Sequence, residues 1–274
     1  MAYRHVFIPI RGWFVGIGTS LLVVALHFAG IGVRLPLTIF ATAVIFPLAF
    51  TIAEAFRRRE FCLDRLGSIT GGLRTMHVNI CGLPSTTTKW ERDLQDLALG
   101  LIEFLSFELA APETESERHR RSVDIHLARM ARWIHGMKVE AAEIPGFAGN
   151  MDVQFSSVVS AVEDLRFIRQ YRTPAIMRAF SFVWSMGLPT ITSLTMAYWT
   201  LDAGLTVWWH VLIAALVAQL SLSLMMEALV NAQQGLEQPF DGIGDDDVEL
   251  DAVQLLNSMR AEQTAFADVT VEEE

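Results

Sequence analysis

The longest uninterrupted apolar stretch of the chain runs from Leu35 to Ala53. At a helical rise of about 1.5 Å per residue, a stretch of this length can cross a bilayer core of roughly 30 Å. Pro47 removes one backbone donor in its middle, which membrane helices tolerate. The stretch then passes a single acid, Glu54, which we expect to be buried, and ends in Arg57, Arg58 and Arg59. This pattern predicts a membrane span over residues 35–56.

Three further apolar segments have the length of membrane spans, and they cover residues 13–31, 179–200 and 205–229. The region between the second and third spans has polar and apolar residues at the period of amphipathic helices, and no alternating β pattern. We expect helices there over residues 57–76, 90–110, 114–143 and 152–171. The chain is therefore predicted to be an all-α, four-span membrane protein.

The same pattern divides the chain into four parts. An N-terminal transmembrane pair covers residues 1–56, and a helical bundle inserted between the spans covers 57–178. A C-terminal transmembrane pair covers 179–229, and an acidic tail covers 230–274, which we expect to end without regular structure.

Composition and charge support this organisation and suggest an orientation. Hydrophobic residues make up 52% of the chain and charged residues only 19%. Of the 21 basic residues, 17 lie in the inserted bundle, so the positive-inside rule predicts that the bundle and both termini are cytoplasmic. The expected location is a bacterial inner membrane, an organelle membrane or a plasma membrane. From Asn231 onward there are 12 acidic residues and one basic residue, which argues against nucleic acid as a partner.

Candidate chemistry within the second span is limited to one helix face. Thr42, Phe46 and Phe50 are four residues apart, so they share a face of the helix. Two interpretations stay open at this point: an aromatic-lined pore, or simple packing against another helix.

Few other residues indicate a site. Cys62 and Cys81 form no disulfide framework and no metal-ligand spacing, and we expect both to be reduced and buried. His119, Asp124 and His126 fall on a charged helix face that we expect to be solvated and not a zinc site.

His27 is expected to be a hydrogen-bonded membrane histidine and not a proton relay. No catalytic motif occurs, so the sequence does not indicate an enzyme.

Several short motifs in this order resemble the bestrophin family of anion channels, and its bacterial members more closely. Phe50, with Ala55-Phe56 and Arg58 following it, is similar to a motif in the family's second span. Thr173-Pro174 and Leu188-Pro189 are similar to motifs around the third span. Glu237-Gln238-Pro239-Phe240 and Asp247-Val248-Glu249-Leu250-Asp251 resemble the family's acidic segment after the last span.

The resemblance implies a homopentamer in the lipid bilayer, with one axial pore that conducts chloride or other small anions. By position, Thr42, Phe46 and Phe50 would form the pore neck, with Glu54 and Arg58 at the pore entrance and selectivity region. Glu54 departs from the family, which has a neutral residue near this level, so a weakly selective or cation-favouring pore stays open. A non-conducting membrane scaffold that binds partners through its cytoplasmic helices is the other alternative.

The resemblance implies one candidate cofactor, calcium. An acidic run could supply the oxygen ligands that Ca²⁺ prefers, although its spacing is not that of an EF-hand and a solvated acidic tail is the simpler interpretation. The residues of this run are Asp245, Asp246, Asp247, Glu249 and Asp251.

Overall fold

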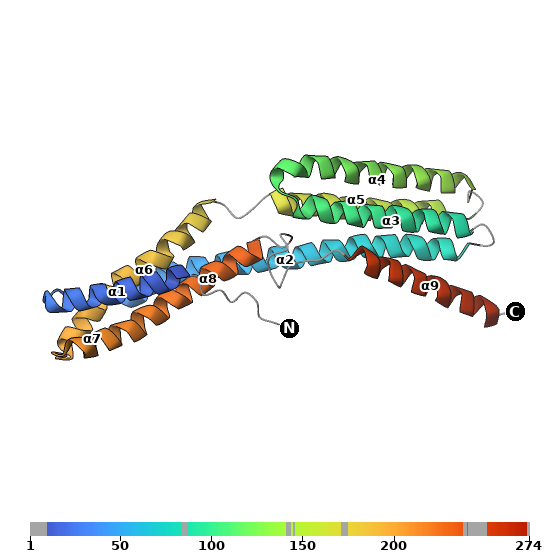
Figure 1. Ribbon diagram of the computed structural model, residues 1–274. Coiled ribbons are helices and arrows are strands. Elements are labelled where there is room, and N and C mark those ends of the chain that lie inside the picture. Colours follow the sequence, from blue (N-terminus) through green and yellow to red (C-terminus); the bar gives the residue numbers. More distant parts are fainter. Residues whose placement is uncertain are drawn as a thin grey trace. The chain divides into compact units, whose positions relative to one another are not determined.

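The structure, a computed structural model, describes residues 10–83, 87–140, 144, 146–170, 175–237, 240 and 251–272. These residues form helices and no strand, which confirms the all-α prediction for the described part of the chain (Figure 1). The helices are α1 (Ile10–Phe28), α2 (Leu37–Cys81), α3 (Thr87–Ala110), α4 (Glu113–Glu140), α5 (Phe147–Gln170), α6 (Ala175–Asp202), α7 (Trp208–Ala215), the π-helical turn η1 (Leu216–Leu220), α8 (Ser221–Glu237) and α9 (Ala252–Glu272).

The chain forms two compact units. The membrane unit, as we name it, comprises Met1–Arg58 and Arg172–Gln238, and the helical unit comprises Arg59–Tyr171 and Pro239–Glu274. The second span and the first expected helix of the bundle are one continuous helix, α2, which contributes to both units. The expectation of an irregular tail is wrong for α9, which forms a long helix within the helical unit.

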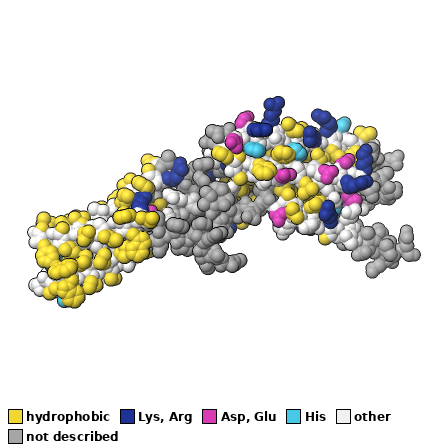
Figure 2. Space-filling view, in the orientation of Figure 1, with side chains coloured by type: hydrophobic (Ala, Val, Ile, Leu, Met, Phe, Trp, Pro, Cys, Tyr) yellow, Lys and Arg dark blue, Asp and Glu magenta, His cyan; other side chains and the backbone are white. Residues whose placement is uncertain are grey.

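The membrane unit buries small and polar side chains and exposes large apolar ones. On α1, the buried residues are Gly12, Gly16, Thr19, Ser20, Val23 and His27. On the same helix Phe14, Ile17 and Leu21 are exposed, and Figure 2 shows apolar side chains gathered over the part of the surface that belongs to α1, α6 and α7. This is the arrangement expected of helices surrounded by lipid, because lipid does not drive apolar side chains into the interior.

Two glycines let α1 approach its neighbours closely. A Cβ atom on Gly16 would lie 2.9 Å from the Cα atom of Leu220, in η1, and one on Gly12 would lie 3.3 Å from the Cβ atom of Glu227, in α8. Gly18, which lies on another side of α1, has no neighbour within 4 Å of such an atom. The close contact of α1 with η1 and α8 therefore depends on the glycines at positions 12 and 16, four residues apart.

Several polar side chains buried in the membrane unit have partners within it. His27 Nδ1 lies 2.9 Å from Thr200 Oγ1, in agreement with the expected hydrogen-bonded histidine. The Thr192 hydroxyl donates to Gln219 Oε1 at 3.2 Å. Pairing of this kind is what an apolar surrounding requires, and it gives these side chains a structural role.

Among the described residues, three stretches are long and apolar enough to cross a membrane: α1, α2, and the continuous helix Trp208–Leu236 formed by α7, η1 and most of α8. The predicted third span, α6, is not among them. It carries seven serine and threonine residues, of which five are buried: Ser181, Ser185, Ser193, Thr195 and Thr200. These hydroxyls lower the hydropathy of α6 although most of them face other helices.

The helical unit has the opposite pattern, with an apolar core and a charged exterior. Leu94, Leu101, Leu105 and Leu109 of α3 are buried, and they pack with apolar residues of α2, α4, α5 and α9. In Figure 2, lysine, arginine, aspartate and glutamate side chains are spread over the surface of this unit. This is the pattern of helices that pack in water.

A buried arginine ties α5 to α3 and α4. Arg166 donates to both carboxylate oxygens of Glu108, at 2.9 and 3.0 Å, and pairs with Asp124 at 2.8 Å and with Glu163 at 2.6 Å. Burial alone lowers the pKa of Arg166, but these carboxylates outweigh it and hold the pKa above its ordinary value. The bidentate pair with Glu108, which is itself buried, fixes the geometry of this contact.

We expect Arg166→Met to lower the free energy of unfolding of the helical unit by about 3 kcal/mol or more, because it leaves the Glu108 carboxylate buried without its partner. Thermal unfolding of the detergent-solubilised protein measures the effect. Lys138→Met, which removes an exposed pair with Asp152, is the matched control and should cost less than about 1 kcal/mol. Equal losses in the two variants would contradict a special role for the buried pair.

Candidate functional site

The candidate site is one face of α2 within the membrane unit. Val44, Leu48 and Ala55 are buried and form the face that packs inward, where Val44 and Leu48 contact Leu188 of α6 and Met226 of α8. These contacts fix how the helix is rotated about its axis. The opposite face is therefore the one that the other described residues leave uncovered.

Thr42, Phe46 and Phe50 lie on this uncovered face and are all exposed. The side chain of Phe46 is 61% exposed and that of Phe50 is 60% exposed, whereas Leu48 between them is 2% exposed. The two phenyl rings contact each other edge to face, with centroids 4.8 Å apart and an interplanar angle of 81°. Their aromatic surface is thus directed away from the described helices of the chain, so packing inside the unit does not account for it.

Glu54 continues the same line one turn after Phe50. The expectation that Glu54 is buried is wrong for the single chain, because its side chain is exposed. Arg58 follows one further turn along and is half-buried. The uncovered face of α2 therefore carries, in order, a hydroxyl, two phenyl rings and a carboxylate, and the half-buried Arg58 follows them. We call Thr42, Phe46, Phe50, Glu54 and Arg58 the α2 line.

The residues proposed to bind calcium are mostly outside the described part of the chain. This applies to Asp245, Asp246, Asp247 and Glu249, and also to Thr173-Pro174 among the motifs. Asp251 is described, and its Oδ1 accepts hydrogen bonds from the backbone N–H groups of Val253 and Gln254 at 2.8 and 3.0 Å. Asp251 is therefore an N-cap of α9, a role that satisfies backbone donors without any ion.

The two histidines and the aspartate on the charged helix face, which we did not expect to bind zinc, have other contacts. His126 Nδ1 lies 2.9 Å from the backbone oxygen of Ser122, and Asp124 pairs with Arg166. His119 stacks on Phe107. The structure instead brings together His77, Cys81 and Glu91, of which the first two are one helical turn apart. The spacing of His77 and Cys81 could have indicated this cluster, but the pairing of α2 with Glu91 of α3 could not be read from spacing.

No protein-family model and no curated protein matches the sequence. Among solved structures, the chain is similar to crystal structures of a bacterial bestrophin homologue from Klebsiella pneumoniae. One, with a single substitution, has a TM-score of 0.75 and 14% sequence identity, over 95% of this chain and 99% of that one. A second substituted form has a TM-score of 0.74 and 13% identity, over 94% and 98% of the two chains. A third structure has a TM-score of 0.73 and 13% identity, over 94% and 97%.

These similarities show that the chain has the bestrophin fold over nearly its whole length. At 13–14% identity the likeness establishes the fold alone, so the roles of individual side chains rest on their own geometry.

The two faces of α2 should respond differently to truncation. We expect Leu48→Ala to lower the stability of the membrane unit by about 2 kcal/mol, because it opens a cavity against Leu188 and Met226. Phe46→Ala should leave the unfolding midpoint nearly unchanged, since its ring packs on no buried cluster. Thermal unfolding in detergent, followed by tryptophan fluorescence, compares the two variants. A larger loss for Phe46→Ala would mean that the α2 line is a packing surface.

Proposed function

We propose that this chain is a bestrophin-type ion channel, in which five copies surround one axial pore and chloride or another small anion passes passively. The observation that carries this proposal is the exposure of Phe46 and Phe50 on a membrane helix whose other face is fully packed. The bestrophin fold over nearly the whole chain supports it.

The membrane topology of the proposal has four spans, with α6 as the third, and places the helical unit and both termini in the cytoplasm. The buried hydroxyls of α6 support its inclusion, since they face other helices and leave apolar residues such as Phe182 and Val183 exposed. The placement of 17 of the chain's 21 basic residues between the second and third spans supports the orientation. The membrane is a bacterial inner membrane, an organelle membrane or a plasma membrane.

The chemistry of the α2 line fits passive conduction and involves no catalytic step. In a pentamer, Phe46 and Phe50 would form two rings of five phenyl groups, with Thr42 one turn above as a polar, less constricting ring. The edge of a phenyl ring carries partial positive charge and can face an anion that has lost part of its water shell. A narrow apolar ring can also close the pore by dewetting.

Glu54 is the residue that decides selectivity in this proposal. A ring of five exposed carboxylates next to the neck repels anions and attracts cations, while Arg58 one turn further on has the opposite charge. The same architecture therefore allows a weakly selective or cation-favouring pore as the second version of the channel.

A non-conducting scaffold that binds proteins through its helical unit is the alternative to a channel. It is favoured by one observation, the apolar residues exposed on the helical unit, among them Phe107 and Phe167. The mass of the solubilised protein separates the two functions. The channel requires a mass five times that of the 30.6 kDa chain, after correction for detergent, and a monomer or dimer would exclude the axial pore.

Truncation of the neck tests the pore lining. We expect Phe46→Ala combined with Phe50→Ala to raise the single-channel conductance severalfold, because two constricting rings become methyl groups. Recording from purified protein in planar bilayers measures the change. Phe14→Ala, which removes an equally exposed phenyl group from α1, is the matched control and should leave the conductance unchanged. Unchanged currents in the double variant would remove Phe46 and Phe50 from the pore.

Neutralisation of Glu54 tests the selectivity. We expect Glu54→Gln to raise the ratio of chloride to potassium permeability about fivefold, because a nearby unit charge in water contributes about 1 kcal/mol. Reversal potentials under a potassium chloride gradient report this ratio. Glu60→Gln, also exposed but on another side of α2, is the control. The same ratio in wild type and Glu54→Gln would mean that Glu54 does not face the ion path.

A further inference from the structure

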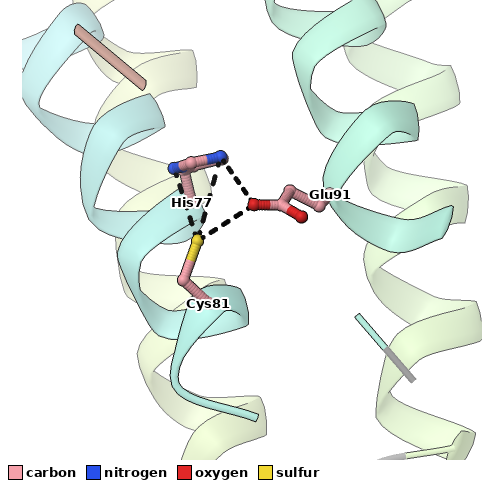
Figure 3. A group of neighbouring side chains, drawn as sticks. All are labelled: His77, Cys81 and Glu91. Atoms are coloured by element: carbon pink, nitrogen blue, oxygen red, sulfur yellow. Dashed lines mark hydrogen bonds and ion pairs between the residues drawn. The ribbon is translucent and has the colours of Figure 1, made fainter. Parts of the chain in front are cut away.

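The helical unit contains a cluster of side chains with the chemistry of a transition-metal site. His77 and Cys81 lie one turn apart near the end of α2, and Glu91 lies in the first turns of α3 (Figure 3). In the part of the chain that the structure describes, no other group of histidine, cysteine and acidic side chains converges in this way. His77 is fully buried, Glu91 is nearly so, and Cys81 is partly exposed, which leaves a route for an ion from solvent.

The distances between the candidate ligand atoms are close to those of a tetrahedral zinc site. Cys81 Sγ lies 3.2 Å from Glu91 Oε1, and His77 Nε2 lies 3.5 Å from the same oxygen. Cys81 Sγ lies 4.0 Å from His77 Nε2. Zinc bonds of about 2.0–2.3 Å place neighbouring ligands of a tetrahedron about 3.4–3.6 Å apart. Since Cys81 Sγ is also 3.8 Å from His77 Nδ1, closing the site requires a rotation of the His77 ring that turns Nε2 toward Cys81, with small shifts of the other two side chains.

A carboxylate from a third helix lies beside the histidine. Glu262 of α9 has its Oε2 atom 3.7 Å from His77 Nδ1, and this buried oxygen has no hydrogen-bond partner. Its other oxygen pairs with Arg74, whose Nε donates at 2.7 Å. A metal on Nε2 would keep the proton on Nδ1 and direct it at the unpartnered oxygen. This is the carboxylate–histidine arrangement that commonly supports zinc ligands.

The charges of the cluster also suit a divalent ion. Without metal, the Cys81 thiol donates its proton to Glu91 Oε1. A divalent ion replaces that proton, which leaves to solvent, and its two charges balance the Cys81 thiolate and the Glu91 carboxylate.

We propose that His77, Cys81 and Glu91 bind a zinc-like divalent ion that fastens α2 to α3, with Glu262 of α9 orienting His77. Sulfur, imidazole and carboxylate ligands in a tetrahedron favour Zn²⁺ among common ions, and Co²⁺ binds the same donors. Gln95 lies 3.2 Å from His77 Nε2 through its amide nitrogen. Rotation of that amide would offer its oxygen as a fourth ligand, and a water molecule is the alternative.

Cobalt is the probe for this site because a bond to a thiolate gives it a charge-transfer absorption band. The full-length protein in detergent, stripped with a chelator and titrated with Co²⁺, should bind one ion per chain and develop this band, and Zn²⁺ should remove it. The Cys62→Ser variant, which loses the chain's other cysteine, should keep the band, and Cys81→Ser should lose it. A missing band in wild type, or a band that persists in Cys81→Ser, would overturn the proposal.

Two further measurements apply even where Cys81→Ser does not fold. In the Cys62→Ser background, Zn²⁺ should slow alkylation of Cys81 at least tenfold, and equal rates with and without Zn²⁺ would overturn the site.

Glu262→Gln should weaken Co²⁺ binding about tenfold or more, as loss of an orienting carboxylate does. Glu103→Gln, which removes an exposed acid elsewhere on α3, is the control and should bind Co²⁺ as wild type does. Equal affinities in Glu262→Gln and Glu103→Gln would remove Glu262 from the site.

Discussion

The medium around each helix is the constraint on which the rest of this structure depends. In lipid, backbone groups must pair within helices, and polar side chains must find partners inside the unit. In the membrane unit, buried His27 pairs with Thr200, and large apolar side chains such as Phe14 and Leu21 are exposed. The helical unit obeys the rule for water, with leucines inside and charges outside. The chain therefore contains one unit of each kind, and α2 contributes residues to both units.

Within that constraint, the rotation of α2 determines what the membrane unit can do. Leu48 is held against α6 and α8, so Phe46 and Phe50 must face away from them. Such an uncovered face can border lipid, a partner chain or a pore. The carboxylate of Glu54 on the same line makes plain lipid contact costly, since a charge in hydrocarbon is expensive. This is the physical reason for our proposal that the α2 line faces an ion path.

The helical unit adds a separate chemistry at the far end of α2. The Arg166–Glu108 pair ties α5 to α3 through charge, and the cluster of His77, Cys81 and Glu91 ties α2 to α3 through potential metal ligands. Both sites replace apolar contact with a few directional interactions at helix crossings. Such interactions specify geometry more strictly than apolar packing does, because they depend on distance and angle.

The sequence by itself determined the helical class and the apolar segments, because hydrophobic runs and helical periods are local properties. It also placed Thr42, Phe46 and Phe50 on one face, since residues four apart share a face in any helix. Only the tertiary structure decided that this face is uncovered, that Glu54 is exposed, and that α9 is a helix. It alone brought Glu91 and Glu262 to His77, because contacts between helices depend on how the helices pack and not on spacing along the chain.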